Sequence, residues 1–270
     1  MGHAGGMSGP IVGSRAGTPA KRDLNRLHLG CGLITPPGWI NVDGSWNARL
    51  AKHPVMRRVL HTLHLLPPDK LEVPWNSEVL IHDVRKPLPF PADSASAVYA
   101  SHLLEHLYLQ EGRQLIRECF RVLAEGGVLR VVVPDLHSIV REYLGERPFG
   151  ELPKDFESLP PADRLNRRLL MWSPAPPAGN LLYRIYNSWR GFHSHKWMYD
   201  ADSLIAELEA AGLVEVQQME LHKSRIDGIE QVEDPSRVLK GEGICVEGVK
   251  PRVGLSLAAS EKHLERQSTR

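Results

Sequence analysis

Strand-like apolar segments alternate with helix-like segments through the first half of the chain, and this order limits the fold more than any other feature. Strands that are joined through helices pair in parallel, with the helices packed on the faces of the sheet. The segments with strand-like patterns are residues 26–30, 39–43, 78–84, 96–101 and 126–135. The sequence therefore predicts an α/β fold with a mostly parallel central sheet.

Two helices have clear end signals. Residues 111–127 place apolar side chains at helical spacing and stop at Gly126 and Gly127. A second helix begins at Asp200 or Asp202 as its cap and ends at Gly212. The segments VEVQQMEL and GICVEGV follow this helix, and we expect them to be late strands of the sheet.

The chain is predicted to form one domain with two insertions. Its 270 residues, 42% hydrophobic and 24% charged, can bury one sizeable core. We expect this domain at residues 24–250, with insertions at 44–77 and 146–192, a flexible leader at 1–23 and a flexible tail at 251–270. The second insertion is rich in proline and aromatic residues, which favours an ordered lid.

Charge and cysteine content disfavour several classes of partner. The 33 basic and 32 acidic side chains leave a formal charge of +1, so no strong field recruits nucleic acid. The three cysteines are widely spaced, which indicates neither a disulfide framework nor a zinc knuckle. No segment has the roughly 20 apolar residues of a membrane span, and the start lacks the apolar core of a signal peptide. We expect a cytoplasmic protein without integral membrane contact, and a homo-oligomer stays open.

A glycine turn and two carboxylates follow the first three expected strands. Gly30 and Gly32 flank Cys31 directly after the first strand, where missing β-carbons let a ligand approach the backbone. Cys31 itself is interpreted as a small loop residue and not as a nucleophile. Asp43 ends the second strand and Asp83 ends the third. Ligands of doubly wound sheets bind at the carboxyl ends of the strands, so these residues predict a ligand site, with Asp43 placed to accept ribose hydroxyls.

A nicotinamide-dependent oxidoreductase would use the same carboxylate but fits the glycine pattern less well. Such enzymes normally carry G-x-G-x-x-G at the start of a full helix, which binds the pyrophosphate. Thr35 stands at the third glycine position, and ten residues between Gly32 and Asp43 are too few for a crossover helix plus a strand. This class therefore remains a weaker alternative.

Four ordered blocks resemble the class I S-adenosylmethionine-dependent methyltransferases. The blocks are LHLGCG, GWINVD, HDVRKPLPFPADSASAVYASHLLEHL and ECFRVLAEGGVLRVVVPDL, and they span residues 26–136 in the correct order. The resemblance is to a predicted small-molecule, type-11-like group with a short first crossover. It implies a Rossmann-like three-layer fold with an antiparallel C-terminal strand and a lid insertion, and S-adenosyl-L-methionine as the cofactor.

The resemblance also implies residue roles. The glycine turn passes beneath the methionine part of the cofactor, Asp43 holds the ribose, and Asp83 with the Val84 backbone contacts the adenine edge. Ser101 and His102 lie near the sulfonium and the incoming substrate. The implied cofactor-binding residues are thus Gly30, Cys31, Gly32, Asp43, Asp83, Val84, Ser101 and His102. His28 departs from the family, because many members carry an acid there that anchors the amino group of the cofactor.

The stretch HLLEH, residues 102–106, has the letters of the inverted zinc-protease signature. A zinc site needs both imidazoles on an established helix and a third ligand from elsewhere. Here His102 is expected at a strand end, and Glu105 and His106 in the following turn. We therefore expect no metal. Glu105 and His106 are predicted to line or brace the cofactor edge, with His106 either catalytic or an inert hydrogen-bonded residue.

The segment 191–200 carries two more histidines, His193 and His195, which would turn to one side of an extended chain. A polar surface loop and a metal pair are alternatives to an active-site role. A histidine there with a near-neutral pKa could take a proton from an acceptor hydroxyl. The candidate catalytic residues are His106, His193 and His195.

The sequence thus predicts an S-adenosylmethionine-dependent methyltransferase that closes residues 146–199 over a small-molecule acceptor. The favoured acceptors are a sugar, a polysaccharide precursor or a secondary metabolite, methylated at a hydroxyl or an amine. A non-catalytic S-adenosylmethionine-binding or scaffold protein is the alternative, because His28 departs from the family pattern and no base is securely identified.

Overall fold

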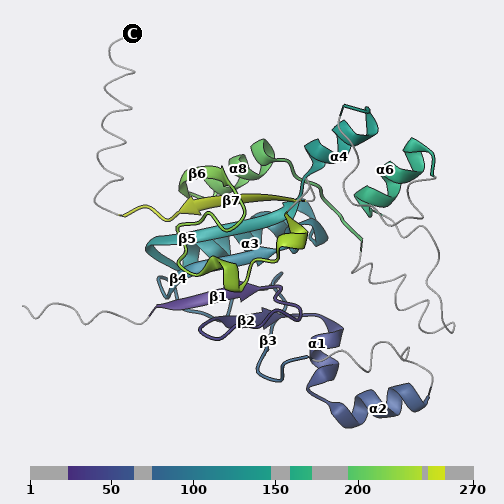
Figure 1. Cartoon of the computed structure of the whole chain (residues 1–270). Coiled ribbons are helices and arrows are strands. Elements are labelled where there is room, and N and C mark those ends of the chain that lie inside the picture. Colours follow the sequence, from purple (N-terminus) through teal and green to yellow (C-terminus); the bar gives the residue numbers. More distant parts are fainter. Residues whose placement is uncertain (1–23, 64–74, 147–158, 172–193, 239–242, 253–270) are drawn as a thin grey trace, which may run out of the picture.

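The computed structural model describes residues 24–63, 75–146, 159–171, 194–238 and 243–252 (Figure 1). The leader expected at residues 1–23 lies outside these ranges, as does most of the tail expected at 251–270. The described part of the second insertion is its short middle section. None of the helices within the described ranges is long and apolar enough to cross a membrane.

One sheet of seven strands forms the centre of the described chain, in the order β3-β2-β1-β4-β5-β7-β6. The strands are β1 (Asn25–Leu29), β2 (Ile40–Asp43), β3 (Leu80–Ile81), β4 (Ala95–Ser101), β5 (Leu123–Pro134), β6 (Val214–Met219) and β7 (Gly243–Val249). The first five pair in parallel, whereas β7 is antiparallel to both β5 and β6. The predicted α/β fold, with a mostly parallel sheet and an antiparallel C-terminal strand, is confirmed.

The strand β5 is buried along most of its length. Every residue from Gly127 to Pro134 is buried, because β4 and β7 pair with its two edges and side chains cover both of its faces. Such burial explains its continuous β-branched sequence, since a strand covered on both faces does not alternate polar and apolar residues. By contrast, β3 is shorter than expected, because only Leu80 and Ile81 pair with β2.

Helices and short turns complete the fold. They are α1 (Trp46–Ala51), α2 (Pro54–Thr62), η2 (Leu104–His106), α3 (Leu109–Val122), α4 (Leu136–Tyr143), α6 (Pro161–Leu169), α8 (Ala201–Ala210), η3 (Ile229–Gln231) and η4 (Pro235–Arg237). The cap of α8 is Asp200, whose Oδ1 accepts the Ser203 amide at 2.9 Å. The chain leaves α8 at Gly212, which has a φ of +100°.

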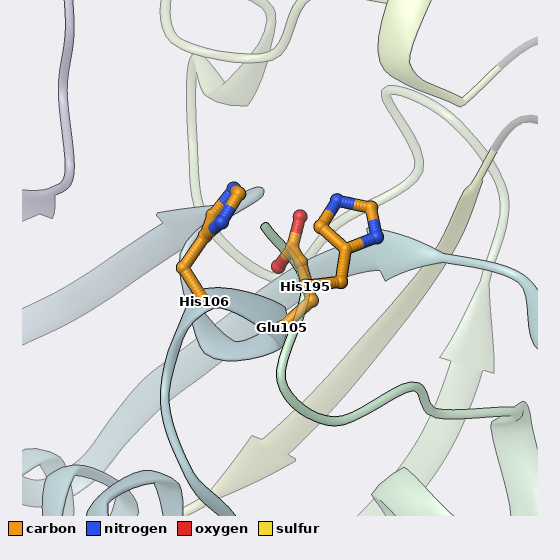
Figure 2. A group of neighbouring side chains, drawn as sticks. All are labelled: Glu105, His106 and His195. Carbon is orange, nitrogen blue, oxygen red and sulfur yellow. The ribbon is translucent and has the colours of Figure 1, made fainter. Parts of the chain in front are cut away.

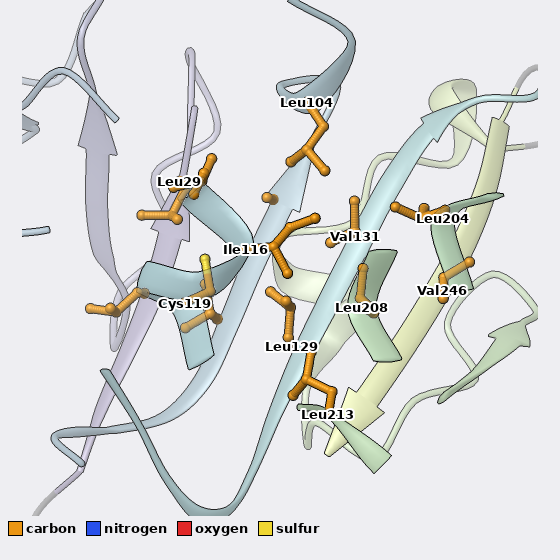
Figure 3. Close-up of a cluster of buried hydrophobic side chains, with 14 of the residues drawn as sticks. Leu29, Leu104, Ile116, Cys119, Leu129, Val131, Leu204, Leu208, Leu213 and Val246 are labelled. Carbon is orange, nitrogen blue, oxygen red and sulfur yellow. The ribbon is translucent and has the colours of Figure 1, made fainter. Parts of the chain in front are cut away.

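The larger hydrophobic core lies between the sheet and the helices α3 and α8. Figure 3 shows this cluster, in which Ile116 and Cys119 of α3 and Leu204 and Leu208 of α8 meet β-strand residues such as Val131. These apolar side chains repeat every three or four positions, so each helix presents one apolar face to the sheet. The apolar spacing that predicted α3 is the spacing of its buried face.

The opposite face of the sheet is covered by residues 220–238, which contain η3 and η4. Apolar side chains there, including Ile226, Ile229 and Val232, pack against Tyr99 and Val132. The central charged group is Arg130, fully buried and paired with Glu233 and Glu247 at 2.8 and 2.9 Å. Layers on both faces of the sheet agree with the expected Rossmann-like three-layer arrangement.

The strand order reverses between β1 and β4, which are neighbours in the sheet. From β1 the chain crosses to β2 on one side through a loop without a helix, and from β4 it crosses to β5 on the other side. Doubly wound sheets bind ligands outside the carboxyl ends of the strands at such a reversal. In Figure 1, α1 and α2 lie to one side of this end of the sheet, and α4 and α6 lie to the other.

Candidate functional site

The glycine turn after β1 leaves open space at the strand end. Gly30 and Gly32 have φ values of +66° and +55°, which favour glycine. A β-carbon on Gly32 would meet no atom within 4 Å, whereas one on Gly30 would lie 3.2 Å from a methyl carbon of Leu103. Between them, Cys31 is buried, and this burial raises the pKa of its thiol to about 12. Cys31 is therefore protonated near neutral pH, in agreement with a small loop residue and not a nucleophile.

Asp43 at the end of β2 holds the glycine turn in place. Its Oδ2 accepts the Gly32 amide at 3.0 Å, and its Oδ1 accepts the Ser45 amide at 2.7 Å. Each carboxylate oxygen can accept more than one hydrogen bond, so both retain acceptor capacity. Asp43 is 7% exposed. Asp43 thus shapes the glycine turn, a role that the sequence did not indicate, and its contact with ribose hydroxyls stays a prediction.

Asp83 is already paired with its neighbour Arg85. The two groups form a bidentate ion pair with distances of 2.9 and 2.8 Å. Hydrogen bonds from the Arg85 guanidinium are the main cause that lowers the pKa of Asp83 to about 2. Val84 packs against the main hydrophobic core. The adenine contact expected of Asp83 and the Val84 backbone stays a prediction, and Arg85 would border that contact.

Ser101 and His102 lie at the end of β4, as expected. The Ser101 carbonyl accepts the Arg237 guanidinium at 3.2 Å. His102 has a φ of +50°, a backbone conformation that is uncommon outside glycine and that often marks functional sites. Its Nδ1 lies 3.2 Å from Oε1 of Glu105, and its Nε2 lies 3.3 Å from the Arg237 carbonyl oxygen. The imidazole is therefore braced between η2 and η4.

Two of the three candidate catalytic histidines meet. His106 follows Glu105 in η2, and the ring centroids of His106 and His195 lie 5.0 Å apart at an interplanar angle of 68°. Figure 2 shows both rings beside the carboxylate of Glu105. Burial lowers the pKa of both histidines, so both are neutral near neutral pH. His193 lies outside the described residues.

Residues 194–200 are fastened across the ends of β4 and β5. The Glu105 carbonyl accepts the amides of Lys196 and Trp197 at 2.7 and 3.3 Å. Further along, Tyr199 pairs with Asp135 after β5, and its carbonyl accepts the Leu136 amide at 2.9 Å. This path carries His195 to the strand ends, where it is buried, and its catalytic role stays a prediction.

His28 does not take the place of an anchoring acid. Its ring is 2% exposed and packs against the rings of Trp39 and Tyr99, at centroid distances of 6.4 and 5.2 Å. This burial lowers the pKa of His28 to about 4, so the ring carries no charge near neutral pH. His28 belongs to the smaller aromatic core of the sheet.

Sequence reasoning missed one neighbour of the strand-end residues. Glu105 was predicted to line or brace the cofactor edge, and its side chain is fully buried beside two histidines. Arg237 was not singled out, although its guanidinium and its carbonyl contact Ser101 and His102. No local signal could have found Arg237, because it lies more than a hundred residues away from β4 in the sequence.

Comparison with known families gives one match. Residues 56–131 match a family described as a methyltransferase domain. The matched part runs from α2 into β5 and includes the expected adenine-side residues, the end of β4 and the HLLEH stretch. No curated protein sequence matches the chain.

Several solved structures align with this chain. One belongs to the complex of the Haloferax volcanii Trm112 methyltransferase activator with a methyltransferase. It aligns with a TM-score of 0.41 and 14% sequence identity, and the alignment covers 86% of this chain and 87% of that chain. An S-adenosylmethionine-dependent methyltransferase from Thermotoga maritima aligns with a TM-score of 0.40 and 15% identity, and the alignment covers 84% of this chain and 81% of that chain. Phosphoethanolamine N-methyltransferase 2 from Haemonchus contortus, in complex with S-adenosyl-L-methionine, aligns with a TM-score of 0.39 and 13% identity. The alignment covers 87% of this chain and 50% of that chain.

Proposed function

We propose that this chain, which carries a class I S-adenosylmethionine-dependent methyltransferase domain, methylates a hydroxyl or an amine of a small-molecule acceptor. A sugar, a polysaccharide precursor or a secondary metabolite is the favoured acceptor class. The observation that carries the proposal is the glycine turn that Asp43 holds at the reversal of strand order between β1 and β4. This is the place where a doubly wound sheet binds its ligand.

The residues at this edge fit S-adenosylmethionine. Gly32 leaves free the space that a β-carbon would fill, so the backbone can approach the methionine part of the cofactor. Asp43 retains acceptor capacity for the ribose hydroxyls after its bonds to Gly32 and Ser45. When bound, S-adenosylmethionine supplies a methyl group on an electrophilic sulfonium.

The protein then has to align the acceptor with that methyl group and exclude water. Ser101 and His102 lie at the end of β4, which borders the glycine turn, and residues 194–200 cross the neighbouring strand ends. His106 and His195 are neutral because of their burial, so either can accept a proton from an acceptor hydroxyl. An amine acceptor that is already deprotonated would need no such base.

Binding of the cofactor is the first test. We expect S-adenosylmethionine and S-adenosylhomocysteine to bind the purified full-length chain at micromolar concentration in calorimetry. Asp43→Asn should weaken this binding at least tenfold, because it removes the charge and one acceptor oxygen. Asp93→Asn is the matched control, since the Asp93 side chain is 57% exposed and lies in a turn away from the strand ends.

The outcomes separate the three functional classes. Absence of cofactor binding by a folded wild type would overturn the methyltransferase proposal, and binding of NAD instead would indicate an oxidoreductase. Formation of S-adenosylhomocysteine with sugars, phenols or small amines would support a small-molecule acceptor. Tight cofactor binding without turnover across such a panel would favour a non-catalytic binding protein.

A further inference from the structure

Glu105, His106 and His195 form a compact group of metal-ligand side chains at the ends of β4 and β5. One ligand atom from each residue lies within 4.8 Å of the other two (Figure 2). We propose that this group binds one divalent transition-metal cation, with Zn²⁺ as the best match. No other group of three such side chains meets this criterion within the part of the chain that the structure describes.

The buried carboxylate of Glu105 is the group that a bound cation would stabilise most directly. Its side chain is 0% exposed, and neither carboxylate oxygen has a hydrogen-bond partner among the described residues. Burial of an ionised carboxylate without a partner costs on the order of several kcal/mol. Proteins normally avoid this cost by pairing the charge or by coordinating a metal. Nδ1 of His102 lies 3.2 Å from Oε1 of Glu105 and forms an ion pair with it only when His102 is protonated.

The nearby lysine does not supply the missing charge. The ammonium group of Lys196 donates to the carbonyl of His106 at 2.8 Å and also lies over the ring of Tyr108. It is therefore engaged by a backbone oxygen and an aromatic face. Within the described ranges, no lysine or arginine pairs with the Glu105 carboxylate, and a bound cation would provide the compensating charge.

A hydrogen bond orients the ring of His106. Nδ1 of His106 lies 3.4 Å from the Ser194 carbonyl oxygen and can donate a hydrogen bond to it, which leaves Nε2 as the nitrogen that can bind a metal. Such a carbonyl partner is the usual means of orienting a metal-binding histidine.

The position of His195 is held from both sides. Its amide donates to the Leu170 carbonyl at 2.9 Å, and the next residue, Lys196, donates to the Glu105 carbonyl at 2.7 Å. Nδ1 of His195 is buried and has no hydrogen-bond partner among the described residues. The third ligand is thus delivered by backbone contacts that do not themselves require a metal.

The third ligand that HLLEH lacked is supplied by the fold. His102 is not part of the group, because its ring nitrogens face Glu105 and the Arg237 carbonyl. The inverted zinc-protease arrangement therefore does not form. Instead, Glu105 and His106 combine with His195, which is 89 positions after His106 in the sequence.

The ligand set points to a particular class of cation. Two imidazole nitrogens and one carboxylate oxygen suit Zn²⁺ and other first-row transition metals, whereas Mg²⁺ and Ca²⁺ prefer oxygen ligands only. Three protein ligands also leave at least one coordination position open, as in catalytic zinc sites. Resting on the proposed function, we assign this open position to a hydroxyl oxygen of the acceptor, whose pKa the cation would lower. The hydroxyl would then lose its proton to water, and the two histidines would serve as ligands and not as the base. The site therefore favours an oxygen acceptor over an amine.

Metal binding by the full-length chain tests the proposal directly. After removal of metals with a chelator, Zn²⁺ titrated in calorimetry should bind with one equivalent per chain at the site, and Co²⁺ should give a visible absorption band of a coordinated ion. Glu105→Gln and His195→Gln should each weaken binding at least tenfold. His53→Gln is the matched control, because His53 is an exposed histidine in a turn.

The results separate this site from adventitious binding by other histidines. Absence of Zn²⁺ and Co²⁺ binding, or equal binding by wild type, Glu105→Gln and His195→Gln, would overturn the proposal. Circular dichroism establishes that each variant is folded, and if Glu105→Gln does not fold, His195→Gln decides alone.

S-adenosylmethionine binding is measured on the same samples. Cofactor binding without metal binding overturns only the metal site, whereas metal binding without cofactor binding overturns only the proposed function.

Discussion

The carbonyl oxygen of Glu105 accepts a hydrogen bond from the amide of Lys196 at 2.7 Å. This bond joins the turn after β4 to a segment that lies far away in the sequence. Because His195 precedes Lys196, the bond brings the imidazole of His195 beside His106. Together with the bond from the His195 amide to the Leu170 carbonyl, this contact holds the polar group that we place over the acceptor.

Gly32 in the glycine turn and Gly38 in the loop that follows allow a comparison of the effects of an added side chain. Gly32 and Gly38 both have positive φ values, +55° and +78°, and a β-carbon on either would meet nothing within 4 Å. Alanine at either position should reduce the free energy of unfolding by about 1–2 kcal/mol, because the backbone of both glycines has a left-handed conformation. Only Gly32→Ala should also weaken S-adenosylmethionine binding, by about tenfold or more, because only its methyl group enters the proposed cofactor space. Urea denaturation and calorimetry measure the two effects, and equal affinity losses would contradict our placement of the cofactor.

The buried charge network of Arg130 predicts a large stability effect. Arg130, Glu233 and Glu247 are all fully buried. Arg130→Met should lower the free energy of unfolding by about 3–5 kcal/mol, because it leaves two carboxylates buried without their partner. Arg141→Gln should change it by only about 0–1 kcal/mol, since the Arg141 and Glu146 side chains are 46% and 53% exposed. Urea denaturation of both variants checks the contrast, and a small loss in Arg130→Met would mean that the carboxylates find other partners.

His28 should make the fold sensitive to mild acid. Burial lowers its pKa from 6.5 to about 4. Between these values the unfolded chain binds a proton that the folded protein does not, so stability falls as the pH decreases from 6.5 to 4. Over this range the wild type should lose about 3 kcal/mol more than His28→Phe, since each pKa unit corresponds to about 1.4 kcal/mol. Urea denaturation at several pH values measures this difference, with His53→Gln as an exposed control. Identical pH profiles of wild type and His28→Phe would show that His28 does not titrate in this range.

The pairing of Asp83 with Arg85 should be visible as a shifted titration. The pKa of Asp83 is lowered to about 2, chiefly by hydrogen bonds from Arg85. The stabilising contribution of the pair is present above the unfolded pKa of about 4 and is lost as the pH falls through about 2. Arg85→Gln should return the pKa of Asp83 towards its usual value. Lys86→Gln should change it little, because Lys86 is the smallest of the named causes. NMR titration of the carboxyl carbon distinguishes the two, and an unchanged pKa in Arg85→Gln would exclude the pairing.

Local sequence patterns predicted the sheet, and the edge strand shows their limit. β5 was predicted from continuous β-branched residues, and α3 and α8 from apolar spacing with end signals, because each pattern reflects the burial of its own element. The strand expected at residues 78–84 is only Leu80–Ile81 in the structure. Only Val42 and Asp43 of β2 pair with it, and the sequence of the strand itself contains no information about its partner.

The sequence by itself determined the α/β order of elements, the glycine turn, the carboxylate at the end of β2 and the resemblance to methyltransferases. All of these depend on residues close together in the chain, where backbone preference and apolar periodicity act. Only the tertiary structure decided that His28 faces an aromatic core, that Arg130 meets Glu233 and Glu247, and that His195 joins Glu105 and His106. These contacts join residues up to a hundred or more positions apart. They form because packing the elements on one sheet brings the strand ends together, and no local pattern records which distant side chains will meet there.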